Sequence, residues 1–410
     1  MNSTAQLPRM RLVVGLPDVH PGKGFPIGSA SVSEDVFYPH LVGGDIGCGM
    51  SLFQTSIKAK KQKLDVWADS LEGLEQPWGG DTGEWLRQRS CVTTDHDAHT
   101  LGTIGGGNHF AELQEVHEIL NPQAWQALGL SEDQLFLLVH SGSRAYGESI
   151  LREHMDTFGP RGLLVDSEEG RKYMANHDQA LSWARANRAL IAHRFMACLT
   201  LDKVQPVCRD ALTDPTPDGS ERKLDVWHNF VCKKHFHTTS ASKPSSSTEA
   251  SSSSAPEEPQ AESSSLNSGI AVGQSLWLHR KGAAPADQGP VIIPGSRGHY
   301  SYLVLPSNDN ADLEHAAYSL AHGAGRKWAR GKALQLGKAN TKKADALTTT
   351  DLGSRVICEN KDLLYEEVPA AYKEIETIIA DLKSFKLISV IAIFKPLITY
   401  KTRVVNYGGK

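Results

Sequence analysis

A serine-rich tract, residues 240–265, interrupts a chain whose other parts have an ordinary globular texture. Its 26 residues include 12 Ser, 3 Pro and 4 Glu, and contain no Val, Ile, Leu, Met, Cys or aromatic residue. A segment of this composition buries too little apolar surface to offset the entropy of ordering its backbone. We therefore expect disorder over 240–265, so that a single domain has to assemble from residues 1–239 and 266–410.

The charge balance excludes some modes of nucleic-acid binding. The 410 residues carry a formal net charge of -4, and the tract, with one Lys and four Glu, supplies -3 of it. The rest of the chain is close to neutral, which argues against a polybasic nucleic-acid binder but leaves room for a local basic channel. The six cysteines form no CxxC pair, so a disulfide-stapled or zinc-finger protein is not indicated.

The chain shows no sign of membrane insertion or export. Residues 1–10 lack the apolar core of a signal peptide, and no stretch approaches eighteen uninterrupted apolar residues. We expect a soluble cytoplasmic protein without a membrane partner.

Strand and helix patterns alternate irregularly along the chain. Short apolar or alternating segments predict strands at 12–16, 29–37, 50–57, 134–140, 223–231, 275–280, 299–305 and 387–394. Three- and four-residue apolar spacing predicts a long helix at 171–199, with weaker helices at 61–74, 148–158, 326–336 and 371–382. Because no phosphate-binding fingerprint follows the first strand, we expect a single α+β domain, not a doubly wound sheet.

Two glycine-rich segments carry the first candidate ligands. Asp45 and Cys48 lie three apart within the sequence GGDIGCGM, where glycines allow two side chains to converge, and a thiolate beside a carboxylate suits a borderline divalent ion. His109 follows three consecutive glycines that could expose amides to a phosphate. The alternatives are a tight turn around a buried free cysteine and a plain turn before a strand.

Three further histidines stand at candidate site positions. His140 ends an apolar strand that runs into Ser141-Gly-Ser-Arg144, and His228 lies with Asn229 inside an otherwise apolar strand. His322 precedes Gly-Ala-Gly and then two cations, where a phosphate could approach. Taken alone, His140 or His228 could be a hydrogen-bonded structural residue, and His322 could be a nucleophile, an acid or base, or a ligand.

The candidates are stronger together than singly. Independent structural roles for all five of the following residues are improbable, and we expect a two-metal set with the thiolate as a bridge, suited to phosphoryl or nucleotidyl transfer. Its members are Asp45, Cys48, His109, His140 and His228.

The order of these motifs resembles that of the RtcB family of RNA-splicing and RNA-repair ligases. The matching segments are PDVHPGKG from residue 17, GGDIGCGM, GGGNHF, HSGSR, RKGA, PGS and HGAGR. The resemblance runs from about residue 12 to residue 401, apart from the serine-rich tract. It implies an α+β fold with β-sheets around a central metal and GTP cleft and helices outside.

The resemblance also implies a reaction. GTP- and manganese-dependent enzymes of this family join an RNA 3′-phosphate, or a 2′,3′-cyclic phosphate after hydrolysis, to a 5′-hydroxyl, in RNA repair or tRNA splicing. The matching nucleophile is His322, which would form a histidine–GMP intermediate with loss of pyrophosphate. GMP would then activate the RNA 3′-phosphate, and the 5′-hydroxyl would attack last.

The site residues carry over motif by motif. One manganese ion would be held by Asp45, Cys48 and His109, and the other by Cys48, His140 and His228. The implied guanylate contacts are Asn108, His109, Phe110, Ala111, Glu112, His228, Asn229, Pro294, Gly295, Ser296, Arg297, Ser301, His322, Gly323, Ala324, Gly325 and Lys401. RNA ends are the implied partner, together with an archease-like activator.

Several departures resemble the shorter, release-factor-H-coupled branch of the family. The PDVHPGKG motif begins after only sixteen residues, Arg297 stands where methionine is typical, and the serine-rich tract is unusual. Two rival functions remain. A two-metal phosphoesterase acting on RNA ends would need the same ligands, and a non-catalytic RNA-end binder would bind without consuming GTP.

Overall fold

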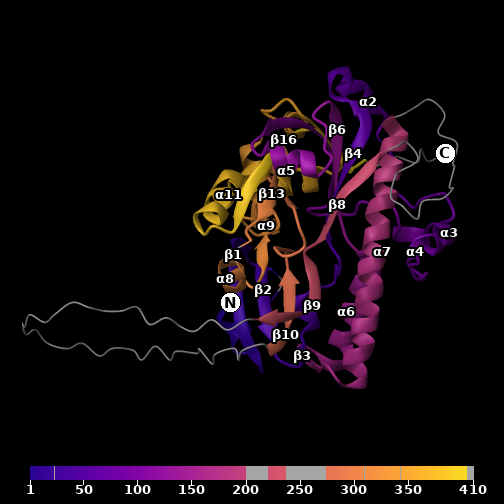
Figure 1. The fold of residues 1–410 in the computed structure, drawn as a ribbon. Helices are drawn as coiled ribbons and strands as arrows, with labels where there is room; N and C mark the ends of the chain where they lie inside the picture. Colours follow the sequence, from indigo (N-terminus) through magenta and orange to yellow (C-terminus); the bar gives the residue numbers. More distant parts are fainter. Residues whose placement is uncertain (23, 200–219, 237–273, 309, 342, 404–410) are drawn as a thin grey trace, which may run out of the picture.

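The computed structural model describes residues 1–22, 24–199, 220–236, 274–308, 310–341 and 343–403. This part of the chain forms β-sheets with helices packed outside them, so the expected α+β class is confirmed (Figure 1). The tract 240–265 lies outside the described residues, and its disorder stays a prediction. Strands from both sides of it pair in both large sheets.

The strands fall into two large and two small sheets. The four-stranded sheet has the order β1 (Met10–His20), β2 (Ile27–Ser33), β10 (Gln274–Lys281), β9 (Asn229–Phe236). The larger sheet has the order β12 (Val291–Pro294), β13 (Ser301–Pro306), β16 (Ile388–Thr402), β5 (Phe110–Ile119), β6 (Gln134–Ser141), β4 (Gly49–Lys58), β8 (Glu221–Trp227), with β15 (Arg355–Cys358) parallel to β16. The two-stranded sheets are β11 (Ala283–Pro285) with β14 (Ser319–Ala321), and β3 (Val36–Phe37) with β7 (Leu163–Leu164).

One helix dominates the helical part. The helix α7 (Glu168–Leu199) runs beside β8 and β9 along one side of the molecule (Figure 1). The shorter α-helices are α1 (Asn2–Ala5), α2 (Leu64–Ser70), α3 (Thr82–Arg87), α4 (Asp97–Thr100), α5 (Pro122–Ala127), α6 (Arg144–Phe158), α8 (Asn310–His315), α9 (Arg330–Asn340), α10 (Lys361–Glu366) and α11 (Ile375–Ser384). Single turns of 3-10 helix lie at η1 (Pro39–Leu41), η2 (Ala59–Lys61), η3 (Ala344–Leu347) and η4 (Pro369–Ala371).

The antiparallel pairing gathers strand ends at one edge of each large sheet. In the larger sheet β4 and β5 begin where β6 and β8 end, because Gly49 pairs with both Ser141 and Trp227, and Phe110 pairs with His140. In the smaller sheet β1 and β10 end where β2 and β9 begin. Loops that follow or precede these strands therefore meet in one place, which is the usual position of a site.

Residue 228 is where the chain passes from one sheet to the other. β8 ends at Trp227 in the larger sheet, and β9 begins at Asn229 in the smaller one. The predicted single strand 223–231 was therefore wrong: two strands meet there, and His228 is at the junction instead of inside a strand. The period-two pattern is the same on both sides of the junction, so the sequence does not reveal the change of sheet.

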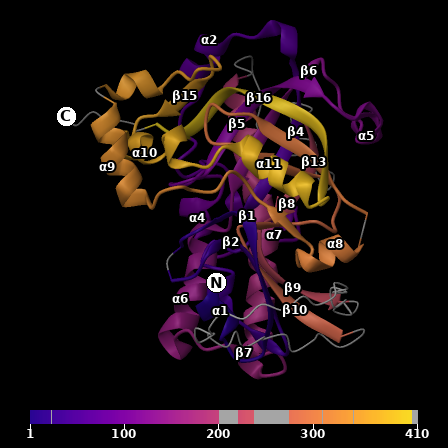
Figure 2. The same cartoon turned by 90° about the vertical axis from the view of Figure 1, so that its left-hand side faces the viewer.

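Three apolar clusters hold the sheets and helices together. One joins both large sheets to α11 and includes Val32, Leu278, Val304 and Ile378. A second lies between the larger sheet and α7, and a third covers the opposite face of the same sheet beneath α5. In Figure 2, which is turned by 90° from the view of Figure 1, α11 and β16 face the viewer. Burial on both faces fixes the register of the central strands that carry the site.

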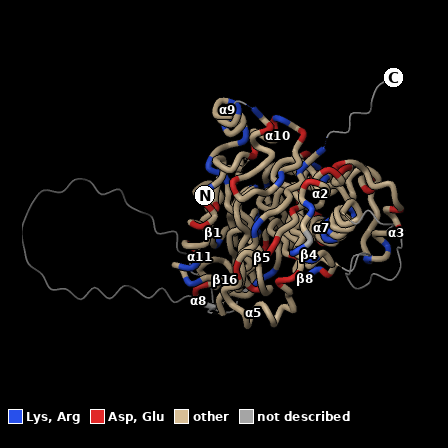
Figure 3. Tube along the Cα trace, turned by 90° about the horizontal axis from the view of Figure 1, so that it is seen from above, with Lys and Arg blue, Asp and Glu red and all other residues tan. Residues whose placement is uncertain are grey.

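Charged residues of both signs are interspersed over the trace (Figure 3), in keeping with the near-neutral folded part. Among the described residues, no helix is both long enough and apolar enough to span a bilayer.

Candidate active site

A buried thiol lies between two imidazoles at the shared edge of the larger sheet. Cys48 directly precedes β4, His109 directly precedes β5 and His140 is near the end of β6. Cys48 Sγ lies 3.3 Å from His109 Nε2 and 3.2 Å from His140 Nε2. These three ligand atoms lie within 4.8 Å of one another, so the group could hold a metal ion.

Asp45 extends this group on the His109 side. Its Oδ2 lies 2.9 Å from His109 Nε2, and its Oδ1 accepts a hydrogen bond of 3.1 Å from the Arg144 amide. The other ring nitrogen of His109 donates to the Ile104 carbonyl at 3.1 Å, which leaves Nε2 directed at Cys48 and Asp45. Burial acts to raise the pKa of Asp45, but His109 and Arg144 outweigh it and the pKa is lowered.

Burial favours the uncharged forms of Cys48, His140 and His228. It raises the pKa of the Cys48 thiol well above its usual range, and the Asp45 carboxylate acts in the same direction. It lowers the pKa of His140 and His228 well below their usual range, and neighbouring histidines add to the effect. A divalent cation at this position would stabilise the deprotonated, negatively charged form of Cys48 by its positive charge. One thiol, one carboxylate and neutral imidazoles fit a borderline divalent metal ion.

His228 lies beyond His140, in a row of imidazoles. The ring centroids of His109 and His140 are 5.1 Å apart, those of His140 and His228 are 5.1 Å apart, and those of His228 and His322 are 4.7 Å apart. The His228 amide donates to the Cys48 carbonyl at 2.8 Å, which ties the sheet junction to the cysteine loop. The structure thus brings together all five predicted metal ligands.

His322 is held by an aspartate from a distant part of the chain. It follows β14, and its Nδ1 lies 2.6 Å from Asp18 Oδ2, while its backbone amide donates to the same oxygen at 3.2 Å. Because a carboxylate oxygen accepts, Nδ1 carries the proton and Nε2 keeps its lone pair. The Asp18 side chain is fully buried, so the imidazole has a fixed tautomer and a fixed orientation.

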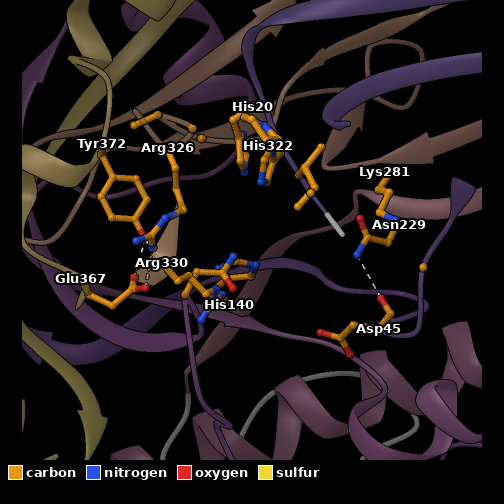
Figure 4. Close-up of a pocket in the computed structure, with 18 of the residues that line it drawn as sticks. His20, Asp45, His140, Asn229, Lys281, His322, Arg326, Arg330, Glu367 and Tyr372 are labelled. Carbon is orange, nitrogen blue, oxygen red and sulfur yellow. Dashed lines mark hydrogen bonds and ion pairs between the residues drawn. The ribbon is translucent and has the colours of Figure 1, made fainter. Parts of the chain in front are cut away.

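A cavity of about 1130 Å³ opens beside these groups (Figure 4). His20 and His322 lie next to each other on one wall of it, with Arg326, Glu367 and Tyr372 on one side and Lys281, Asn229 and Asp45 on the other. The predicted nucleotide contacts that line it are Asn108, Phe110, Glu112, Asn229, Pro294, Gly295, Ser296, Arg297, His322, Gly323, Ala324, Gly325 and Lys401.

Four predicted contacts are not among the described residues that line the cavity. His109 belongs to the cluster that could hold a metal ion, His228 lies next to His140, and Ala111 is completely buried in β5. Ser301 is also buried, and its hydroxyl accepts a hydrogen bond of 2.9 Å from Gln114 Nε2. These four residues lie next to residues that line the cavity.

A buried acid–base network closes one end of the cavity. Burial raises the pKa of Glu112 to about 7, although Thr399 and Gln114 donate hydrogen bonds to its carboxylate. Burial lowers the pKa of Lys401, whose Nζ donates to the His109 carbonyl at 3.2 Å and lies 3.7 Å from Glu367. This end therefore offers a carboxyl group and an ammonium group to a polar ligand.

Cations around the cavity are tied to the protein. Arg326 donates to Glu367 Oε1 at 2.7 Å, and Arg330 donates to Glu366 at 2.8 Å. Arg297 donates to the Leu364 carbonyl at 2.8 Å, and burial lowers its pKa. Lys281 donates to the His40 carbonyl at 2.9 Å, and burial lowers its pKa to about 8. The positive charge at the cavity therefore comes from a few residues that line it, and not from a bulk excess of basic residues in the chain.

Arg188 is a structural centre that sequence reasoning missed. Its side chain is fully buried in the middle of α7 and donates to the carbonyls of Gly47 at 2.7 Å and Ser141 at 2.9 Å. It also pairs with Asp225 of β8 through two hydrogen bonds, of 2.8 and 2.9 Å. One guanidinium therefore anchors three segments that carry proposed ligands. The only signal was an arginine on the apolar side of a long helix.

Asp18 and His20 were also missed as site residues. Both lie in the PDVH motif at the end of β1, which the sequence comparison used as a landmark without giving either residue a role. The signal available in the sequence was an aspartate two residues before a histidine, followed by Gly22 and Gly24. Their role depends on contact with His322, 304 residues away in the chain, which local pattern does not report.

The chain is similar to known RNA ligases along nearly all of its length. The family model described as tRNA-splicing ligase RtcB matches residues 1–87, 80–243 and 261–402. An RNA-splicing ligase RtcB2 of Escherichia coli is 41% identical over 416 residues, which cover 100% of this chain and 92% of that protein. A tRNA-splicing ligase RtcB of Methanococcus maripaludis is 28% identical over 440 residues, which cover 89% of this chain and 82% of that protein.

Proposed function

Because the chain belongs to the RtcB family, we propose that it is an RNA ligase that uses GTP and manganese. It joins an RNA 3′-phosphate, or a 2′,3′-cyclic phosphate after hydrolysis, to a 5′-hydroxyl end. The relatives carry the names RNA-splicing ligase and tRNA-splicing ligase, which supports RNA ends as the substrate.

The Asp18–His322 pair supports the proposal most directly. Asp18 holds the Nδ1 proton of His322, so Nε2 is a free nucleophile on the cavity wall. In the first step Nε2 attacks the α-phosphorus of GTP, a P–N bond forms, and pyrophosphate leaves. Asp18 stabilises the positive charge that develops on the ring, as a buried aspartate does for a catalytic histidine.

The metal-binding group lies beside this nucleophile. In the proposal Asp45, Cys48 and His109 hold one manganese ion, and Cys48, His140 and His228 hold the other. Bound cations would stabilise the negative charge of the phosphate oxygens. The position of Cys48 Sγ between two imidazole nitrogens supports its role as the shared ligand.

The guanosine end of GTP fits the polar end of the cavity. Guanine offers adjacent N–H donors and a carbonyl acceptor, which match the Glu112 carboxyl and the Lys401 ammonium group. The loops that line the wall include Pro294–Arg297 and His322–Gly325, which we assign to the ribose and phosphate. The remaining contacts are those named from the resemblance.

Two transfers complete the reaction. An oxygen of the RNA 3′-phosphate attacks the phosphorus bound to His322, and GMP passes to the RNA. The 5′-hydroxyl then attacks the 3′-phosphate and GMP leaves, so one phosphodiester bond is formed for each GTP used. An archease-like activator and a place in RNA repair or tRNA splicing are further parts of the proposal.

Labelled GTP tests the proposal. Protein incubated with manganese and GTP labelled at the α-phosphate should carry acid-labile label, because a phosphorus–imidazole bond is labile to acid. His322→Ala should abolish the label. His99→Ala is the matched control, because His99 is an exposed histidine on α4 and is not among the residues that line the cavity. An unlabelled wild-type protein, or equal labelling of His322→Ala, would contradict the proposal.

Product analysis separates the ligase from its rivals. An oligonucleotide with a 3′-phosphate, supplied with a 5′-hydroxyl partner, should give a joined product. Inorganic phosphate without joined product would instead indicate a phosphoesterase. Binding of both ends without consumption of GTP would indicate a non-catalytic RNA-end binder.

A further inference from the structure

A second imidazole stands beside the nucleophile on the cavity wall. His20 ends β1 and its ring lies nearly parallel to that of His322, with centroids 6.5 Å apart and an angle of 18° between the planes. Figure 4 shows both rings extending side by side into the cavity. The proposed transfers use His322 and leave His20 without a role.

The hydrogen bonding of His20 fixes its tautomer. Its Nδ1 lies 2.8 Å from the Asp18 carbonyl oxygen, which can only accept, so Nδ1 carries the proton. Nε2 therefore has a lone pair and, within the described part of the chain, no hydrogen-bond partner. Asp18 thus orients two imidazoles at once, His322 through its carboxylate and His20 through its backbone.

The rings stand between the two halves of the cavity. On one side are Arg326, Glu367 and Tyr372, at the end proposed for guanosine, and on the other are Lys281 and Asn229. In an in-line displacement at phosphorus, the entering and leaving oxygens lie on opposite sides. When GMP leaves toward the guanosine end, the 5′-hydroxyl enters from the side of Lys281 and Asn229 and passes next to His20.

Other bases around the cavity are engaged elsewhere. Glu367 is paired with Arg326 and Tyr372, and Glu112 accepts from Thr399 and Gln114. Lys281 donates to the His40 carbonyl, and Asp45 belongs to the metal-binding group. Glu148 and His40 also line the cavity, and neither ring nitrogen of His40 has a hydrogen-bond partner within the described residues, so an experiment has to separate both residues from His20.

We propose that His20 Nε2 accepts the proton of the RNA 5′-hydroxyl in the last step, an inference that rests on the proposed ligase function. The O–H bond breaks as the new O–P bond to the RNA 3′-phosphate forms. The P–O bond to GMP breaks at the same phosphorus, and GMP leaves with the electron pair. The imidazolium then returns its proton to water.

The charged groups around His20 agree with this role. Burial is the main cause that lowers the pKa of His20 to about 4, and His322 and Lys373 act in the same direction, whereas its contacts with Asp18 raise it. The ring is therefore neutral at neutral pH and ready to accept a proton. An anionic RNA phosphate bound beside the ring raises its pKa and strengthens it as a base.

The acidity of the group at the 5′ end of the RNA partner, which is the nucleophile of the last step, gives a sharp test of the role of His20. RNA that already carries GMP on its 3′-phosphate is joined to a partner ending in a 5′-hydroxyl or in a 5′-thiol, under single-turnover conditions. A thiol ionises near neutral pH without a base, whereas a hydroxyl does not. His20→Gln should slow joining of the hydroxyl end by about 100-fold or more. The loss with the thiol end should be at least about tenfold smaller.

Matched variants complete the design. Joining of the thiol end shows that His20→Gln is folded, and His20→Asn provides a second variant of different length. His99→Gln, at the exposed histidine of α4, should change neither rate. Glu148→Gln and His40→Gln should each reduce the hydroxyl and thiol rates equally or not at all.

Three outcomes would overturn the inference. The first is an unchanged hydroxyl rate in His20→Gln, and the second is an equal loss with both nucleophiles. The third is a hydroxyl-specific loss in Glu148→Gln or His40→Gln instead of in His20→Gln. A wild-type protein that joins neither end would refute the proposed function, and this inference with it. Joining by the wild type with an unaffected His20 variant would refute the inference alone.

Discussion

At the scale of single residues, the site depends on side chains whose partners are far away in the chain. Asp18 contacts His322 and the Ile104 carbonyl contacts His109, and each of these contacts fixes which ring nitrogen carries the proton. Nε2 of His109 and Nε2 of His140 lie against the Cys48 thiol, and His20 and His322 line the cavity. The chemistry therefore follows from tautomers that are set by hydrogen bonds.

Cys48→Ser tests the shared ligand. Because one sulfur is proposed to serve two ions, and a hydroxyl is a poor ligand for borderline metals, the variant should lose both manganese equivalents together. Metal analysis after gel filtration checks this, with Cys91→Ser as the control. Cys91 is another free cysteine of the described chain and is not part of the group. Two full equivalents in Cys48→Ser would refute the bridge.

The Glu112 carboxyl should make stability depend on pH. Its pKa is about 7 in the folded protein and about 4.3 in an unfolded chain, so the folded state binds the proton more tightly. The contribution of Glu112 to the free energy of unfolding is therefore fully present below about pH 4, and it is lost as the pH rises through about 7. Glu112→Gln should flatten the decline in urea-unfolding free energy between pH 5 and 8. An equal decline in both proteins would contradict this.

At the scale of elements, the alternation of strand direction builds the site. β4 and β5 begin, and β6 and β8 end, at one edge, so four proposed ligands from distant segments become neighbours. The helix α7 packs across this sheet, and its Arg188 holds the loop that precedes β4 and the last residue of β6. Packing and ligand placement are thus carried by the same elements.

Arg188→Met tests the link between α7 and the ligand loops. It removes the main charged partner of the buried Asp225, which keeps Arg222 Nη1 at 3.8 Å and the Ser51 hydroxyl, and this should cost about 3 kcal/mol of unfolding free energy. Arg188→Met combined with Asp225→Leu should recover part of that stability, because the buried carboxylate is removed while the buried Arg222 loses this ion pair. Metal affinity should stay reduced in the double variant, since the Gly47 and Ser141 carbonyls lose their donor. Urea unfolding and metal titration separate the two effects.

The secondary structure was predictable where the pattern was long and regular. The helix expected at 171–199 is confirmed as α7, Glu168–Leu199, because its apolar spacing extends over many turns. β5 was missed, because Glu112, Gln114 and Glu115 give its sequence a polar character. Two of these side chains are buried in polar contacts that only the folded chain supplies, so tertiary structure overrides strand propensity there.

At the scale of the whole molecule, the two large sheets contribute different residues to the site. The larger sheet supplies Cys48, His109 and His140, the smaller sheet supplies His20, Asn229 and Lys281, and His228 joins them. The cavity lies where the two edges meet. A change that shifts one sheet against the other should therefore affect metal binding and nucleotide transfer together.

The residues that flank the serine-rich tract in the described structure, Phe236 and Gln274, lie at the end of the smaller sheet far from this cavity. β9 and β10 form an antiparallel pair in which Phe236 is opposite Gln274, while Asn229 and Lys281 pair at the end beside the site. Replacing residues 239–271 by a four-residue turn should keep labelling by GTP unchanged. Shortening this connection should raise the unfolding free energy by up to about 2 kcal/mol, because less loop entropy is lost on folding. Loss of labelling in a folded variant would show a role for the insertion.

The sequence by itself determined the residue types of the site and their positions next to glycine turns and strand ends. It did so because glycine requirements, apolar periodicity and ligand chemistry are local properties of the chain. Only the tertiary structure decided that Asp18 orients His322 and His20, that Arg188 anchors three ligand segments, and that His228 lies at a junction of two sheets. These features depend on contacts between segments from about 40 to 300 residues apart, and long-range packing, not local pattern, fixes such contacts.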